Sequence, residues 1–284
     1  MPAARHPWDQ HRRDLPWRRT RDPWAVLVAE LMLQQTQVPR VIPRYTAFLR
    51  RFPTPAACAA APAADVVRAW AGLGYNRRAL SLHRTAVDVV ERHGGRVPDD
   101  LDALLARPGI GAYTARAVLV FAYERDIGLV DTNAGRFVAR ALAGRAVGRA
   151  EAQRLADAAV PPGDGWAWGQ AVFDLGASIC TRNDPACDRC PVVARCAWFR
   201  AGRPAPDPVA GSAGISGGQS RFVGSDRQGR GRLIDALRHG PVAAPELAAV
   251  MGWPTDAARA ERVAGTLITD GLVSRSAGGF RLAD

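Results

Sequence analysis

Lysine is absent from the 284-residue sequence, so all 38 basic side chains are arginine. Arginine keeps its charge and offers planar hydrogen-bond donors, but it does not form the Schiff base that a lysine amine forms. Only the N-terminal amine could take that role. A reaction that needs a lysine imine is therefore excluded.

Long apolar runs are also absent, since no segment approaches the ~20 residues needed to span a membrane. The first twenty residues, MPAARHPWDQHRRDLPWRRT, hold no apolar stretch of the signal-peptide type. With a hydrophobic content of 48% the sequence fits a globular protein. We expect a cytoplasmic protein with no membrane contact.

Acidic residues are outnumbered, 27 against 38 basic ones, which gives a net charge of +11. A positive balance of this size favours polyanionic partners, above all nucleic acid, because phosphate neutralisation releases counterions.

Cysteine is scarce, with five in the chain, and four of them fall in one short window. Cys180, Cys187, Cys190 and Cys196 have the spacing C-x6-C-x2-C-x5-C, while Cys58 stands alone in an alanine-rich segment. Four thiolates from one loop suit an iron–sulfur cluster. Structural zinc is the alternative, but zinc sites more often use two C-x2-C pairs, and here only Cys187 and Cys190 have that spacing.

Helical periodicity dominates up to about residue 200, and no alternating strand pattern interrupts it. The fold class is therefore predicted to be all-α. The expected helices are Trp24–Gln37, Val66–Trp70, Ala79–Arg92, Asp99–Arg107, Tyr113–Tyr123, Thr132–Ala143, Ala150–Ala159 and Trp166–Ile179.

The composition changes at residues 202–220, which are rich in Gly, Pro, Ala and Ser and predict a flexible linker. Beyond it, three short helices at 230–238, 245–251 and 256–270 precede two strands around a glycine turn. This order predicts a winged-helix-like module over 221–284.

The segment LLARPGIGAYTA, residues 104–115, joins two predicted helices through a tight turn. Gly109 and Gly111 would let backbone N–H groups approach a phosphate at a helix start. Any tight helical corner also favours Pro-Gly. Downstream, Asp131 stands at a helix start, where a plain N-cap is the simpler interpretation.

Glu30 lies within the strongly apolar helix WAVLVAELMLQQTQV, with Val26, Leu27 and Leu33 on its face. Burial there would raise the pKa of its carboxyl and suit it to act as a general acid. Pairing with an arginine is the other interpretation.

These motifs together resemble the MutY-type adenine glycosylases of the endonuclease III superfamily. The resemblance covers about residues 8–200 and rests on RDLPWR, AELMLQQTQV, GLGYNRR, the PGIGA turn, Asp131 and the 6-2-5 cysteine spacing. It implies a helix–hairpin–helix DNA glycosylase fold. A six-helix barrel domain would span 24–133, and a domain carrying a 4Fe–4S cluster would combine 1–23 with 134–201.

In that family the residue matching Glu30 protonates adenine N7, and the one matching Asp131 stabilises the cationic sugar. Tyr113 and Asn133 match the rest of the catalytic set. The resemblance also implies DNA or substrate contacts, namely Gln35, Thr36 and Tyr75 as wedging residues, Arg13, Trp17 and Arg18 near the extruded adenine, and Gly109 and Gly111 at phosphate. Asp174 stands where the family commonly has glutamate in contact with adenine, and the four cysteines match the cluster ligands.

The expected function is removal of adenine opposite 8-oxoguanine or guanine from double-stranded DNA in base excision repair. We expect a monofunctional enzyme, because Tyr113 stands where strand-cleaving relatives have lysine. The enzyme is also expected to be a bacterial, nucleoid-associated monomer. No Nudix-like C-terminal domain is visible. The alternatives are a thymine–guanine mismatch glycosylase and a non-catalytic iron–sulfur protein that binds DNA or senses redox state.

Overall fold

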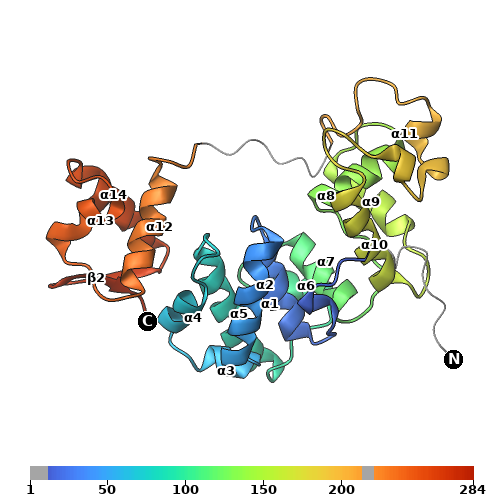
Figure 1. The fold of residues 1–284 in the computed structure, drawn as a ribbon. Helices are drawn as coiled ribbons and strands as arrows, with labels where there is room; N and C mark the ends of the chain where they lie inside the picture. The colour runs from blue at the N-terminus through green and yellow to red at the C-terminus, as the bar shows by residue number, and fades with distance from the viewer. Residues whose placement is uncertain (1–11, 213–220) are drawn as a thin grey trace. The chain divides into compact units, whose positions relative to one another are not determined.

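The computed structural model describes residues 12–212 and 221–284. The first eleven residues of the predicted cluster domain and the last eight of the predicted linker lie outside the described residues. The described chain is helical up to residue 269, and its two strands follow that point, so the predicted all-α class is confirmed (Figure 1). The chain divides into two compact units.

The first unit comprises Met1–Val26, Asp99–Leu105 and Ile110–Gly218. Its elements are η2 (Pro16–Arg18), the start of α1 (Pro23–Leu33), α6 (Leu101–Leu105), α7 (Ala112–Phe121), α8 (Thr132–Phe137), the π-helical turn η3 (Val138–Ala143), α9 (Arg149–Ala158), α10 (Gly165–Ser178), η4 (Cys187–Arg189), η5 (Val193–Arg195) and α11 (Ala197–Arg200). Helices α8 and α10 pack closely at Gly176. A Cβ added there would lie only 2.6 Å from the carbonyl oxygen of Asn133, so the close approach needs a glycine. This contact fixes the start of α8, where Asp131 lies.

The second unit comprises Leu27–Pro98, Ala106–Gly109 and Gln219–Asp284. It holds the rest of α1, followed by α2 (Val38–Arg51), α3 (Pro55–Ala59), α4 (Ala63–Ala69), α5 (Arg77–His93), α12 (Asp226–Leu237), η6 (Ala244–Glu246), α13 (Leu247–Met251), α14 (Ala257–Thr269), β1 (Val273–Ser276) and β2 (Gly279–Leu282). Phe48 and Trp70 meet edge to face in its core, with ring centroids 6.0 Å apart.

Helix α2 is absent from the helices expected from sequence, because its two prolines argue against a helix. Pro39 lies in the first turn, where the missing N–H costs nothing, but Pro43 lies inside. Val41, Tyr45 and Phe48 are nevertheless buried on one face. Burial of this face outweighs the proline penalty.

Helix α1 ends at Leu33, four residues earlier than expected. Gln35 has φ +53°, a left-handed conformation that a continuing α-helix does not contain. Gln35 and Thr36 therefore lie in a turn and not on a helix.

The C-terminal residues form three helices followed by an antiparallel hairpin, in which Val273 pairs with Leu282. Val242 and Phe280 exchange two backbone hydrogen bonds of 2.9 and 2.8 Å, which ties the hairpin to the segment between α12 and α13. This order matches the winged-helix-like module expected from sequence. Among the described residues no helix is long and apolar enough to cross a membrane.

Candidate functional site

The residues Ala106–Gly109, which follow α6 and belong to the second unit, are anchored to α5 of the same unit. The Thr85 hydroxyl donates to the carbonyl oxygen of Pro108 at 2.9 Å. Gly109 has φ +75°, and a Cβ there would lie 2.5 Å from the Cβ of Ser81, so only glycine fits. Gly111 then precedes α7 without a side-chain cap. This geometry suits close approach of a phosphate, and the role of both glycines remains a prediction.

Asp131 caps α8. Its Oδ1 accepts hydrogen bonds from the backbone N–H groups of Asn133 (2.8 Å) and Ala134 (2.7 Å), and its Oδ2 accepts from the Asn133 amide at 3.1 Å. Burial raises the pKa of the Asp131 carboxyl, although these hydrogen bonds oppose the shift. The expected N-cap is confirmed, and the cap holds a partly desolvated carboxylate in one orientation.

Arg136, which the sequence reasoning did not single out, connects this carboxylate to the cysteine loop. Its guanidinium donates to Asn133 Oδ1 at 2.7 Å, to the Gly176 carbonyl at 2.6 Å and to the Cys180 carbonyl at 2.9 Å. The structure therefore brings Asp131 and Asn133 together and fixes the amide of Asn133 through Arg136.

Tyr113 lies in the first turn of α7 and is half-buried. Its ring packs against Phe173 of α10, with centroids 6.2 Å apart. The phenol therefore belongs to the same unit as Asp131.

Glu30 lies on α1 in the second unit and is 5% exposed. Val26 and Leu27 on the same helix are also buried. The burial expected from sequence is thus present, and the general-acid role of Glu30 remains a prediction.

The predicted wedging residues occupy two loops of the second unit that share one arginine. The Arg78 guanidinium donates to the Leu31 carbonyl (2.7 Å), the Thr36 hydroxyl (3.0 Å) and the Leu73 carbonyl (3.2 Å). It also donates to the carbonyls of Met32, Gln34 and Gly74. Arg78 therefore bridges the two loops, and the Thr36 hydroxyl adds a direct hydrogen bond to the Leu73 carbonyl at 3.3 Å.

Arg78 is half-buried, and this burial lowers its pKa to about 10. Its guanidinium also lies 5.4 Å from the ring centroid of Tyr75. Tyr75 has φ +45° and is 40% exposed, so an aromatic ring is presented outward from a constrained backbone. Sequence shows Arg78 only as part of GLGYNRR, and nothing in that motif reveals its acceptors on α1.

Arg13, Arg18 and Asp174 form an ion cluster in the first unit, in which Arg18 and Asp174 are buried and the Arg13 side chain is 38% exposed. Asp174 accepts from Arg18 at 2.7 and 2.8 Å and from Arg13 Nε at 2.6 Å. The Arg18 and Asp174 side chains are 3% and 2% exposed, and Trp17 between the two arginines in sequence is buried. Asp174 holds the two arginines in place, and its expected contact with adenine remains a prediction.

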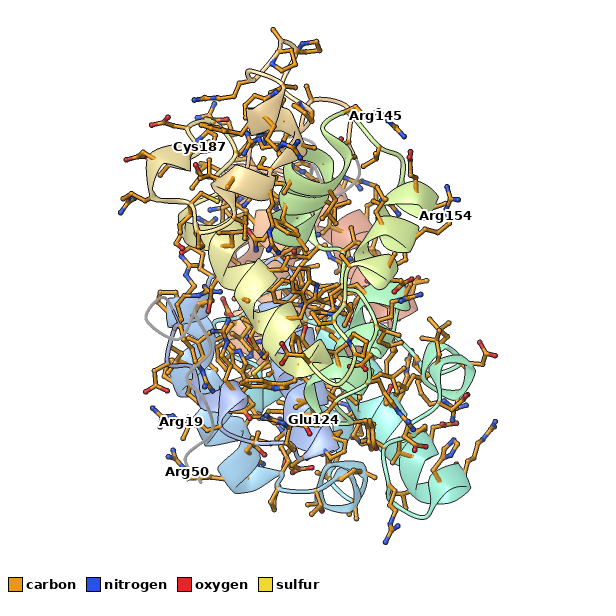
Figure 2. All side chains as sticks on the ribbon, turned by 90° about the vertical axis from the view of Figure 1, so that its right-hand side faces the viewer. Arg19, Arg50, Glu124, Arg145, Arg154 and Cys187 are labelled. Carbon is orange, nitrogen blue, oxygen red and sulfur yellow. The ribbon has the colours of Figure 1, made fainter. Side chains whose placement is uncertain are left out.

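We expect the substitution Arg18→Met to lower the free energy of unfolding by about 3 kcal/mol, because it leaves a buried carboxylate with half its partners. Chemical denaturation measures this change. Arg19→Met is the control: Arg19, labelled in Figure 2, also pairs with an aspartate, Asp14, but both side chains are exposed. The control should leave stability unchanged, and equal effects of the two substitutions would contradict the assigned role of Arg18.

All four clustered cysteines line one pocket, together with apolar side chains such as Phe137, Leu175 and Trp198. Figure 2 shows Cys187 within this loop. Burial raises the pKa of the Cys180 and Cys190 thiols. In the described part of the chain, no three His, Cys, Asp or Glu side chains come together as a site for a metal ion.

Arg140 is 2% exposed and contacts the cysteine loop through its guanidinium. It donates to Cys180 Sγ at 3.5 Å and to the Thr181 carbonyl at 2.6 Å, and it pairs with Asp207 at 2.6 Å. Val209 and Ser212 are buried. The first part of the predicted flexible linker is thus packed, because the buried guanidinium of Arg140 holds Asp207.

Comparison with known proteins agrees with these features. The family described as HhH-GPD superfamily base excision DNA repair protein matches residues 28–162. An adenine DNA glycosylase of Mycolicibacterium smegmatis is 45% identical over 283 residues, which cover 97% of this chain and 93% of the relative. One of Mycobacterium tuberculosis strain CDC 1551 is 44% identical over 285 residues, 96% of this chain and 89% of the relative.

Among solved structures, a thermostable thymine-DNA glycosylase matches with a TM-score of 0.63 and 29% identity, over 68% of this chain and 92% of that one. The helical fold with its glycine hairpin is that of a helix–hairpin–helix base excision repair protein. The chain belongs to this HhH-GPD superfamily, in its MutY-type branch.

Proposed function

We propose that the protein is a monofunctional DNA glycosylase that releases adenine opposite 8-oxoguanine or guanine in double-stranded DNA. The observation that carries the proposal is the buried Glu30 in the apolar helix α1, in a chain 45% identical to an adenine DNA glycosylase over almost its whole length. The presence of Glu30, Tyr113 and Asp131 in one chain argues against a protein that only binds DNA, because such a protein has no use for all three.

In the proposed mechanism the target adenine first leaves the base stack, because the glycosidic bond is not accessible inside the duplex. Glu30 in its neutral form donates a proton to adenine N7, so that the base departs without a negative charge. The Asp131 carboxylate stabilises the positive charge that develops on the sugar, and a water molecule completes the hydrolysis. Asn133 and Arg136 keep that carboxylate oriented.

Strand cleavage is not expected to follow base release. An imine at the sugar needs an amine nucleophile, and position 113 carries a tyrosine in a chain without lysine.

Release of bases from four duplexes tests the proposal directly. The duplexes contain adenine opposite 8-oxoguanine, adenine opposite guanine, thymine opposite guanine, and uracil. Adenine release from the first two, with strand breaks only after alkali treatment, is the expected result. Thymine release from the third would favour the mismatch glycosylase alternative, and release of no base would favour the non-catalytic one.

A 4Fe–4S cluster held by Cys180, Cys187, Cys190 and Cys196 is part of the same proposal. Support comes from the shared pocket, the soft thiolate ligands and the cation of Arg140 beside Cys180. When bound, the cluster would supply structural ties among the loop segments, and the chain's own residues would carry the hydrolysis.

We expect the purified protein to be brown, with about four irons per chain and broad absorbance near ~400 nm. Cys190→Ser should lose the iron, whereas Cys58→Ser should retain it, because Cys58 is buried in α3 and lies outside the loop. Metal analysis and absorbance spectra measure both. Colourless protein with stoichiometric zinc would contradict the cluster.

A further inference from the structure

The C-terminal module, residues 221–284, contacts the segment that carries Tyr75. Arg238 follows α12 and reaches out of the module, although its side chain is only 7% exposed. Its Nε donates to the carbonyl oxygen of Val67 at 3.2 Å, and an Nη donates to Asn76 Oδ1 at 2.7 Å. Burial lowers the pKa of Arg238. Its other terminal nitrogen pairs with Asp235 of the module itself. Arg238 thus links the module to α4 and to the residue after Tyr75.

Asn76 occupies the N-cap of α5, where an asparagine side chain usually accepts a hydrogen bond from the helix backbone. Here it makes no such bond, and its oxygen accepts from Arg238 instead. The local cap has been replaced by a contact from 162 residues away in sequence.

The residues before Asn76 need outside support. Tyr75 and Gly74 both have left-handed backbones, with φ of +45° and +68°. That conformation is unfavourable for a tyrosine and persists only where surrounding contacts impose it. Arg78 holds the segment from the helical side through the Gly74 carbonyl, and Arg238 holds it through Asn76.

Two further contacts place the module against α5. Asp270 pairs with Arg77 at 3.5 Å. Gly271 has φ +75°, and a Cβ there would lie 3.1 Å from a terminal nitrogen of Arg84. The module therefore meets α5 at two points besides the Arg238 contact.

Several arginines on the module are engaged by acids of the module itself. Arg259 and Arg262 both pair with Asp226, Arg275 pairs with Glu261, and Arg230 pairs with Asp270. A winged helix that reads DNA directs such charges at phosphates. The pairing favours a module that packs against its own chain over one that binds the duplex.

We propose that residues 221–284 act as a positioning element for Tyr75, with Arg238 as the positioning residue that works through Asn76. The contact holds Tyr75 in the left-handed conformation in which it enters the duplex at the mispair. The inference rests on the proposed function for the role of Tyr75, but the Arg238–Asn76 coupling stands on the contacts alone.

The full-length chain tests this with Arg238→Met, Asn76→Ala and the double substitution. Amide hydrogen exchange of residues 72–78 in the free protein should be faster in all three variants. The single-turnover rate of adenine release from a duplex with adenine opposite 8-oxoguanine should fall about fivefold, an effect of the size found when two contacting residues are uncoupled. Duplex affinity should stay the same. The double variant should be no worse than either single one.

Arg275→Met is the matched control, because it removes the same charge from the module without touching the Tyr75 segment. If this control and Arg238→Met weaken duplex affinity and its salt dependence equally, the module binds DNA and the inference is overturned. Additive effects in the double variant, or unchanged exchange at 72–78, would also overturn it. A wild-type protein that releases no adenine would instead refute the proposed function, and the exchange result would still decide on the coupling.

Discussion

Glu30→Gln should reduce the single-turnover rate of adenine release by about 10²–10⁴-fold, the usual contribution of a general acid. Adenine departs poorly as an anion, and protonation at N7 removes that charge from the leaving group. Glutamine keeps the size of the side chain and a hydrogen-bond donor, but it has no proton to give at this acidity. Affinity for the mispaired duplex should therefore remain near the wild-type value.

Glu124→Gln is the matched control, since it makes the same chemical change at a carboxylate that is 58% exposed and pairs with Arg21. It should leave the rate unchanged. Rapid-quench measurement of base release and titration of duplex binding separate chemistry from affinity. A Glu30→Gln protein that releases adenine at the wild-type rate would rule out the proposed mechanism.

Asp131→Asn should lower the same rate by about 10²–10³-fold, the cost of removing one preorganised charge-stabilising group. The substitution removes the negative charge but keeps the helix cap, because asparagine caps helices as well as aspartate does. Its side-chain oxygen can still accept from the backbone N–H groups of Asn133 and Ala134. Helix α8 should remain intact while the stabilisation of the sugar cation is lost.

Asp100→Asn provides the control, because Asp100 caps α6 through the Ala103 N–H at an exposed position. Circular dichroism and chemical denaturation should show both proteins folded, and only Asp131→Asn should be slow. Equal rates for the two variants would exclude an electrostatic role for Asp131.

The pH dependence gives a second test of Asp131. Burial raises the pKa of this carboxyl, so its ionised form is lost on acidification at a pH above the ordinary aspartate value of about 3.9. The wild-type rate should fall through that window as pH decreases. Stability should change with pH in the opposite direction to the rate. Because the pKa of Asp131 is higher in the folded than in the unfolded state, the folded protein loses stability as pH rises and this carboxyl ionises. Asp131→Asn should remove that part of the stability profile.

The sequence predicted most helices of the first unit because apolar spacing there is regular and the caps are recognisable. Asp131 illustrates this, since the expected cap appears with two backbone hydrogen bonds. Helix α2 could not be predicted in the same way, because its prolines argue against a helix and only tertiary burial of Val41, Tyr45 and Phe48 explains it.

The supporting arginines were invisible to sequence reasoning for a different reason. Arg78, Arg136, Arg140 and Arg238 act through acceptors that lie far from them in the chain, in several cases backbone carbonyls. A carbonyl carries no side-chain signal, and in a chain with 38 arginines no single one stands out. Sequence motifs identify the candidate reacting groups, whereas the groups that orient them are recognised only from their contacts in the folded chain.

The shared anchorage of two loops on Arg78 bears on how tightly the protein can hold DNA. A loop that becomes ordered only in a complex loses conformational entropy at that moment, and the loss weakens binding. Here the guanidinium orders both loops when the chain folds, through acceptors at Leu31, Thr36 and Leu73. Entropy lost during folding no longer counts against the encounter with a duplex, so Gln35 and Tyr75, the wedging residues of the proposed function, would meet DNA already ordered.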